Sequence, residues 1–204
     1  MSVKVKICGV RNLEAAETAV NSGADFLGFN FVPTSKRYID PKIAKKIIKT
    51  VKGKAKIVGV FQNDEIVHVN DVASNLGLDF IQLHGMEDNE YIESVKVQVI
   101  KSITLDDDLQ KVSADYLMLD RVDRGEGELV DPDKARVIAG EHQIFLAGGL
   151  NPENVSEAVL KVSPFAVDVA GGIETNGVQD LEKIKRFIKN ARLASRAKRA
   201  KGAL

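Results

Sequence analysis

Short apolar segments alternate with longer amphipathic segments along almost the whole chain. The apolar segments are rich in β-branched residues and alternate little with polar ones, which is typical of strands covered on both faces. We expect eight such strands, at Val3–Cys8, Phe26–Val32, Lys56–Phe61, Phe80–Leu83, Val97–Ile103, Tyr116–Asp120, Gln143–Ala147 and Ala166–Val169. A helical segment follows each of them, so the pattern predicts right-handed βαβ units and a parallel sheet.

Several of the helical segments carry start and stop signals. Asn12 is an N-cap before the first helix and Gly23 follows its end, while Asp40-Pro41 and Asn151-Pro152 each start a helix with a cap and a proline. Further helices are expected over Ile66–Leu76, Asp88–Val95, Asp107–Val112, Pro132–Ala139 and Leu181–Leu193.

The end of the chain is basic. The segment Arg192–Leu204 contains five basic residues and no acidic one. We expect residues 193–204 to form a solvated, frayed tail whose cations complement the dipole of the last helix. A tail that binds an anionic partner is the alternative.

A weak internal repeat supports a closed architecture. Similar tetrapeptides precede the second, fourth and sixth predicted strands: Gly23-Ala24-Asp25-Phe26, Gly77-Leu78-Asp79-Phe80 and Ser113-Ala114-Asp115-Tyr116. Repeated units of this size favour an α/β protein with one (β/α)8 TIM barrel domain over residues 1–204. An open doubly wound sheet is disfavoured because no dinucleotide-binding glycine fingerprint follows the first strand.

Composition narrows the class of protein. With 204 residues, of which 44% are hydrophobic, a single globular domain is expected. The 29 basic and 29 acidic residues balance, and Trp is absent, so a nucleic-acid-binding role is disfavoured. No apolar run approaches the roughly 20 residues of a membrane span. One Cys and the lack of a signal-like start predict a cytoplasmic protein.

The candidate chemistry lies where the strands end, because a parallel barrel places its active site there. Glycine-rich turns follow the seventh and eighth strands, at Gly148, Gly149 and at Ala170, Gly171, Gly172. Backbone N–H groups in such turns can approach an anion closely, so the two turns predict a phosphate site. The structural alternative is that these glycines only form tight turns.

An acid and a base are placed almost opposite each other. Cys8 ends the first strand and Asp120 ends the sixth. A thiolate at the first position, favoured by positive surroundings, and an acid at the second would suit an isomerisation. A buried thiol with only a packing role and a capping Asp are the alternatives.

Other polar residues at the same end are candidates for substrate contacts. Arg37 follows the second strand and can bind a carboxylate or phosphate through two hydrogen bonds, although a surface charge is an equal alternative. Gln82, His84 and Asp168 are weaker candidates at strand ends. The three His residues lack partners at metal-ligand spacing, so no metal site is expected.

Several of these segments together resemble the phosphoribosylanthranilate isomerase family. The segments are Lys6-Ile7-Cys8-Gly9-Val10, Ser35-Lys36-Arg37-Tyr38-Ile39, Gln82-Leu83-His84-Gly85, Ala147-Gly148-Gly149-Leu150-Asn151-Pro152-Glu153-Asn154-Val155 and Val167-Asp168. The resemblance runs in order nearly to Arg192. It implies a (β/α)8 enzyme of tryptophan biosynthesis without cofactor or metal, either a monomer or a homodimer. Such an enzyme converts N-(5-phospho-β-D-ribosyl)anthranilate to 1-(2-carboxyphenylamino)-1-deoxy-D-ribulose 5-phosphate by an Amadori rearrangement.

The resemblance also implies residue roles. Cys8 would be the general base, Asp120 the general acid and Arg37 the contact for the anthranilate carboxylate. The two glycine turns would hold the phosphate of the phosphosugar.

Two segments depart from the family pattern. The loop Arg121–Pro132 keeps only part of a glycine-rich run and lacks its Trp, and Ala170-Gly171 replace two hydroxyl residues. A divergent enzyme for a related aminated phosphosugar, or a barrel that only binds a phosphorylated metabolite, are therefore alternatives. The presence of both Cys8 and Asp120 favours the isomerase.

Overall fold

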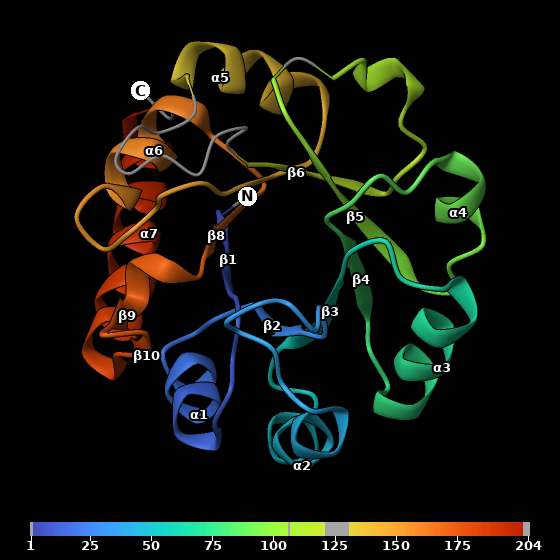
Figure 1. The fold of residues 1–204 in the computed structure, drawn as a ribbon. Coiled ribbons are helices and arrows are strands. Elements are labelled where there is room, and N and C mark those ends of the chain that lie inside the picture. Colours follow the sequence, from blue (N-terminus) through green and yellow to red (C-terminus); the bar gives the residue numbers. More distant parts are fainter. Residues whose placement is uncertain (1, 106, 121–130, 202–204) are drawn as a thin grey trace.

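Eight parallel strands close into a barrel in their sequence order, with the helices outside (Figure 1). This is a computed structural model, and it describes residues 2–105, 107–120 and 131–201. The strands are β1 (Lys4–Ile7), β2 (Phe26–Asn30), β3 (Lys56–Phe61), β4 (Phe80–Leu83), β5 (Gln98–Ile103), β6 (Tyr116–Leu119), β7 (Ile144–Leu146) and β8 (Ala166–Val169). Pairing of β8 with β1, from Lys4 opposite Ala166 onward, closes the barrel. The barrel prediction is confirmed, and the open sheet is excluded.

The helices follow the predicted rhythm. They are α1 (Leu13–Asn21), α2 (Pro41–Val51), α3 (Ile66–Leu76), α4 (Asn89–Glu93), a 3-10 turn η1 (Leu109–Lys111), α5 (Pro132–Glu141), α6 (Val155–Val162) and α7 (Leu181–Lys201). The Asn12 side chain accepts the N–H of Ala15, and Asp40 accepts that of Lys42, so both predicted N-caps are confirmed. None of the described helices is long and apolar enough to span a membrane.

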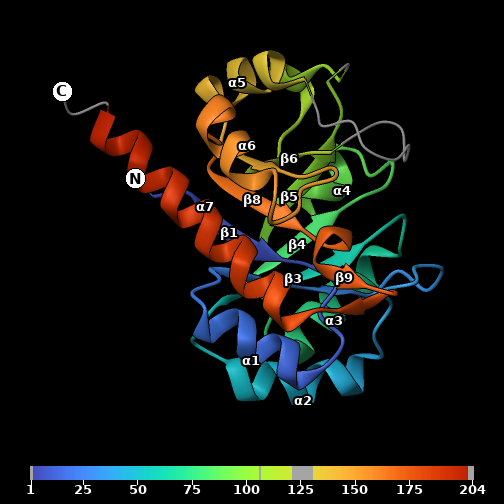
Figure 2. The same cartoon turned by 90° about the vertical axis from the view of Figure 1, so that its left-hand side faces the viewer.

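Three helical segments differ from the sequence pattern. Only a 3-10 turn forms within residues 107–112. The helix expected after Asn151-Pro152 begins at Val155, because the Asn151 side chain accepts the N–H groups of Glu153 and Asn154 and caps a preceding turn. The last helix continues past Leu193 to Lys201 (Figure 2), since its Ala, Arg and Lys residues are strong helix formers.

The sequence pattern did not predict a small hairpin after β8. A 3-10 turn η2 (Gly171–Ile173) leads into β9 (Glu174–Thr175) and β10 (Val178–Gln179). Asn176 and Gly177 connect the two strands with positive φ angles of 53° and 75°. An Asn-Gly pair is a strong signal for this kind of hairpin turn.

The repeated tetrapeptides have one structural role. The carboxylates of Asp25, Asp79 and Asp115 each accept a backbone N–H of the preceding odd strand at 2.8 Å, from Val5, Ile57 and Val99 respectively. Each aspartate thus binds an odd strand to the even strand that follows it, at the amino-terminal end of the barrel.

The barrel interior changes character along its axis. Aromatic rings pack edge to face near the amino-terminal ends of the strands, among them Phe26, Phe80 and Phe145. Towards the carboxyl ends the buried side chains include Lys6, Gln82 and Asp168. A polar layer therefore lies directly beneath the mouth of the barrel. Burying these groups costs free energy unless they form hydrogen bonds or ion pairs with one another.

Candidate active site

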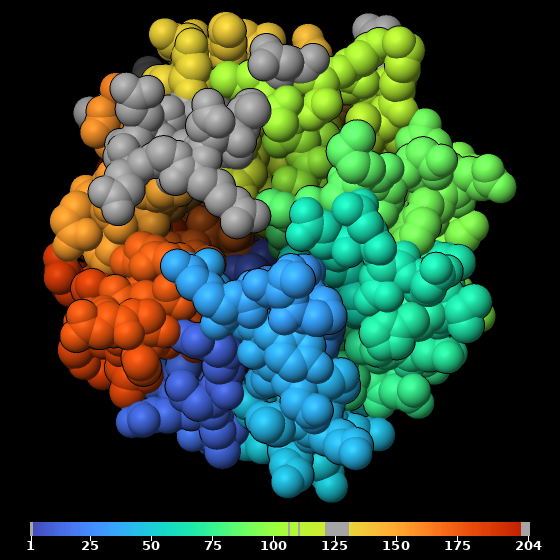
Figure 3. Space-filling view, in the orientation of Figure 1, coloured from blue at the N-terminus to red at the C-terminus, as the bar shows by residue number. Residues whose placement is uncertain are grey.

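The mouth of the barrel is hollowed at its centre (Figure 3). The loop after β2, in light blue, and the segment after β8, in orange, border this hollow. The residues predicted from the carboxyl ends of the strands belong to this end of the barrel.

A buried lysine binds two other polar side chains in the layer beneath the mouth of the barrel. Lys6 on β1 is fully buried, and its Nζ lies 2.7 Å from Asp168 Oδ1 and 2.8 Å from Gln82 Oε1. Burial alone would lower the pKa of Lys6, but Asp168, together with Cys8, raises it above the ordinary value. Lys6 is therefore an ammonium ion held at the centre of the polar layer.

Cys8 lies beside this ammonium group. A Cβ atom built on Gly28 would be 2.8 Å from Cys8 Sγ and 3.3 Å from Lys6 Nζ, so both groups reach the same spot over Gly28. Burial raises the pKa of the Cys8 thiol above its ordinary value, and the charge of Lys6 offsets part of this effect. The predicted positive charge near Cys8 is present in Lys6. Its effect on the pKa of the thiol is smaller than the opposite effect of burial.

Gln82, His84 and Asp120 continue the polar layer towards β6. The Gln82 Nε2 atom lies 3.4 Å from His84 Nδ1 and 3.1 Å from the sulfur of Met118. On its other side, His84 Nε2 lies 3.8 Å from Asp120 Oδ2. About a third of each of these last two side chains is exposed, so the pair lies at the border between barrel and solvent.

Arg37 reaches the mouth of the barrel and forms an ion pair there. Its Nε and Nη2 lie 2.9 and 2.7 Å from the two carboxylate oxygens of Glu174. The side chain runs over Gly9, where an added Cβ would lie 2.6 Å from Arg37 Cδ, and its Nη2 lies near Gly171. One edge of the guanidinium group is thus occupied by Glu174, and its Nη1 atom remains for a ligand as far as the described residues show.

The two glycine turns pack against each other. A Cβ on Gly172 would be 2.0 Å from the carbonyl oxygen of Leu150, so only glycine fits this contact. Gly148 and Gly149 have positive φ angles of 82° and 79°. In the described part of the chain, their backbone N–H groups donate to no protein acceptor. Steric contact and positive φ angles therefore require glycine in these turns. The N–H groups of Gly148 and Gly149 are in addition available to bind an anion.

An ion pair holds the loop that follows His84. The Glu87 carboxylate accepts the N–H groups of Asn63 and Gly85, at 2.7 and 2.9 Å, and pairs with Lys101 at 3.0 Å. Burial alone would raise the pKa of Glu87, but the backbone N–H groups of Asn63 and of Glu87 itself, together with Lys101, lower it below the ordinary value. The loop between β4 and α4 is thereby fixed beside the mouth.

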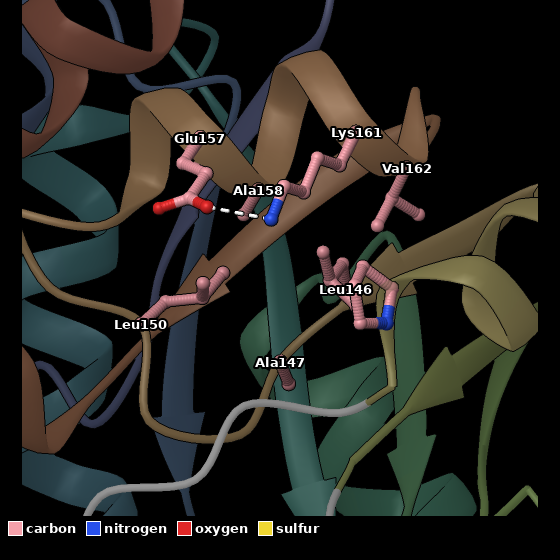
Figure 4. Close-up of a pocket in the computed structure, with 8 residues that line it drawn as sticks. Leu146, Ala147, Leu150, Glu157, Ala158, Lys161 and Val162 are labelled. Atoms are coloured by element: carbon pink, nitrogen blue, oxygen red, sulfur yellow. Dashed lines mark ion pairs between the residues drawn. The ribbon is translucent and has the colours of Figure 1, made fainter.

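A separate apolar pocket of about 200 Å³ lies between the end of β7 and α6. Its lining includes Leu146, Leu150 and Val162, and the ion pair between Glu157 and Lys161 borders it (Figure 4). Neither Cys8 nor Asp120 lines the pocket, although Leu150 lies beside the glycine turn after β7.

Two residues of this site were missed by sequence reasoning. The sequence pattern contains Lys6 only as part of a motif, and it indicates no role for Glu174. Two lysines interrupt this strand, and the position of Lys6 nearer its carboxyl end is the one signal that could have indicated the first. The divergent loop around Arg124–Glu128 lies outside the described residues.

Comparison with known proteins identifies the family. The sequence model of N-(5'-phosphoribosyl)anthranilate (PRA) isomerase matches residues 5–190. The chain belongs to this family. It is 43% identical over 199 residues to the N-(5'-phosphoribosyl)anthranilate isomerase of Citrifermentans bemidjiense, covering 93% of this chain and 97% of that one.

Solved structures of family members agree with the fold. The phosphoribosyl anthranilate isomerase of Thermotoga maritima has a TM-score of 0.86 at 40% identity, over 93% of this chain and 98% of the other. A phosphoribosyl anthranilate isomerase in complex with reduced 1-(o-carboxyphenylamino)-1-deoxyribulose 5-phosphate has a TM-score of 0.80, at 40% identity over the same shares. The resemblance noted in the sequence is confirmed.

Proposed function

We propose that this isomerase of tryptophan biosynthesis uses Cys8 as its general base and Asp120 as its general acid. The observation that carries the proposal is the position of Cys8, which lies under the barrel mouth beside the buried ammonium of Lys6. Asp120 follows β6 on the other side of the polar layer. A substrate bound between them meets a base on one side and an acid on the other.

The Amadori rearrangement needs these two groups in sequence. Asp120 donates its proton to the ring oxygen of the phosphoribosyl group, the C1–O bond breaks, and a protonated Schiff base forms at C1. The Cys8 thiolate then removes the proton from C2, and the electron pair of that C–H bond forms the enolamine. The enolamine tautomerises to the ketoamine product. Every step is a proton transfer or a bond rearrangement, so the proposal needs no metal or cofactor.

The two charged ends of the substrate have separate binding groups in this proposal. The open edge of Arg37 binds the anthranilate carboxylate, while Glu174 holds the other edge and sets the plane of the guanidinium group. The N–H groups of the glycine turns at Gly148-Gly149 and Gly171-Gly172 bind the phosphate. Asp168 and Gln82 support the proposal by holding Lys6, and their predicted weaker contacts with the substrate stay a prediction.

A fluorescence assay of phosphoribosylanthranilate consumption tests the acid–base pair. Cys8→Ala and Asp120→Ala are each expected to lower kcat by at least about 100-fold, the size typical of general acid–base groups. Asp71→Ala, an exposed aspartate on α3, is the matched control and should keep wild-type activity. Full activity of either site variant in folded protein would contradict the assignment.

The cellular setting is part of the same proposal. Cys8 is the single thiol of the chain and is buried without a disulfide partner, which suits a reducing compartment. We therefore place the enzyme in the cytoplasm, acting on a small-molecule phosphosugar. Its assembly as a monomer or a homodimer stays a prediction.

A further inference from the structure

A line of polar contacts crosses the barrel from the base to the acid. Lys6, which neighbours Cys8, contacts Gln82 Oε1 at 2.8 Å. Gln82 Nε2 lies 3.4 Å from His84 Nδ1, and His84 Nε2 lies 3.8 Å from Asp120 Oδ2. The strands β1, β4 and β6 each contribute to this line, so the barrel itself sets its geometry.

The donors and acceptors along the line have one consistent arrangement. A lysine ammonium group only donates, so the Gln82 amide must turn its oxygen towards Lys6. Its NH₂ group then faces His84 and must donate to Nδ1. Because Nδ1 accepts, a neutral His84 ring carries its hydrogen on Nε2, the atom that faces Asp120.

The charge state of His84 agrees with this arrangement. Burial lowers the pKa of His84 below its ordinary value. Asp120 and Asp168 face the ring and favour the imidazolium, while Lys6 and Lys101 oppose it. The net direction is downward, so the ring is neutral at neutral pH and offers a single N–H donor to the carboxyl group.

We propose that His84 is a positioning residue for Asp120, and that Lys6 sets its tautomer through Gln82. The inference rests on the proposed function, in which Asp120 protonates the substrate's ring oxygen. The Nε2–H group lies 3.8 Å from Oδ2 in this structure and closes to hydrogen-bond distance with substrate bound, so that it donates to Oδ2 and leaves the transferable proton on Oδ1. It then stabilises the carboxylate that forms when this proton is given away.

Nitrogen NMR of the imidazole rings tests the tautomer without reference to activity. The chain has three histidines, and the signal lost in His84→Gln identifies the ring. At pH 7 we expect the hydrogen on Nε2 in wild-type protein. Gln82→Glu replaces the donor that faces Nδ1 with an acceptor, so the hydrogen should move to Nδ1 or the ring should become charged. A wild-type ring with its hydrogen on Nδ1, or one that Gln82→Glu leaves unchanged, would overturn the proposal.

Kinetics test whether His84 acts through Asp120. His84→Leu should lower kcat by about tenfold or more, the equivalent of one hydrogen bond to a charged group. His84→Gln, whose amide NH₂ replaces the ring Nε2–H, should restore kcat to within about threefold of wild type. His68→Leu, an exposed histidine on α3, should leave kcat unchanged.

A double-mutant cycle separates this inference from the proposed function. In an Asp120→Asn background, His84→Leu should cause little additional loss of residual activity. An equal loss in both backgrounds would overturn the positioning role alone. Full activity of Asp120→Asn would overturn the acid assignment itself and, with it, the role of His84.

Discussion

Arg37 and Glu174 form a two-point ion pair across the barrel mouth, with N–O distances of 2.9 and 2.7 Å. Arg11 also contacts Glu174, at 3.4 Å, so one buried carboxylate serves two guanidinium groups. With two guanidinium groups and one carboxylate, the cluster has a net positive charge. In the proposed function, this geometry fixes the plane in which Arg37 meets the carboxylate of the substrate, which reduces the entropy lost on binding.

Replacing Arg37 with Met should therefore weaken substrate binding more than chemistry. We expect KM for phosphoribosylanthranilate to rise by about 10- to 100-fold, the equivalent of a lost charge-assisted hydrogen bond, with a smaller change in kcat. Steady-state kinetics measure both constants. Lys36→Met removes an exposed neighbouring charge and is the matched control. An unchanged KM in Arg37→Met would show that the carboxylate binds elsewhere.

The reactivity of Cys8 should depend on two buried charges with opposite signs. Lys6 lowers the pKa of the thiol and Asp168 raises it, while burial keeps it above the ordinary value. Since the base must be a thiolate, kcat/KM should rise as the pH increases from neutral into the alkaline range. Lys6→Met should slow this thiolate chemistry, and Asp168→Asn should speed it.

Alkylation by iodoacetamide measures this effect directly, because Cys8 is the only cysteine. At a fixed neutral pH, we expect the rate to fall about tenfold in Lys6→Met and to rise in Asp168→Asn, with circular dichroism confirming the fold. Cys8→Ala supplies the blank. Equal rates in all three proteins that retain the thiol would mean that neither charge governs it.

The fold was predictable because its signals are local. The strands Lys56–Phe61, Phe80–Leu83 and Ala166–Val169 have the predicted boundaries, since each is a short segment of mainly apolar residues between helical segments. The three repeated aspartates were visible as a pattern, but their bonds to the preceding strands were not. A hydrogen bond between an Asp side chain and a backbone N–H about 20 residues away leaves no periodicity in the sequence.

The site was only partly predictable, because its pairs are distant in sequence. Arg37 and Glu174 are 137 residues apart, and Lys6 and Asp168 are 162 apart. Position at a strand end indicated Cys8 and Asp120, since the barrel brings those ends together. Which nitrogen of His84 faces which neighbour depends on the direction of a hydrogen-bond chain, and this needs coordinates.

The Glu87–Lys101 pair should stabilise the fold in a pH-dependent way. Both side chains are at least nine-tenths buried, so Glu87→Gln leaves Lys101 without its counter-charge. We expect a loss of about 3 kcal/mol in the free energy of unfolding at neutral pH. Urea denaturation measures it, and Glu93→Gln on the exposed face of α4 is the control.

Acidification should remove this difference. The pKa of Glu87 is lowered in the folded state. Its contribution is therefore complete above the unfolded value, roughly 4.3, and is lost as the pH falls through the folded value. Wild type and Glu87→Gln should accordingly converge in stability as the pH falls towards about 3. If the difference in free energy of unfolding between wild type and Glu87→Gln stays constant with pH, the loss of stability comes from side-chain packing and not from the charge of Glu87.

Gly28 should be essential for the geometry of the base. An added Cβ would lie 2.8 Å from Cys8 Sγ and 3.2 Å from the Cα atom of Cys8, so both the thiol and the backbone of β1 must move. Overpacking of this kind costs about 1–3 kcal/mol of stability. A displacement near 1 Å at a reacting group can cost about 100-fold in rate. Gly28→Ala should therefore lower kcat by more than about tenfold while the protein still folds.

Gly140→Ala, where a Cβ meets nothing within 4 Å, is the matched control and should be neutral or slightly stabilising. If Gly28→Ala keeps wild-type kcat, the thiol does not need the position that β1 and β2 give it, and Cys8 is not the base.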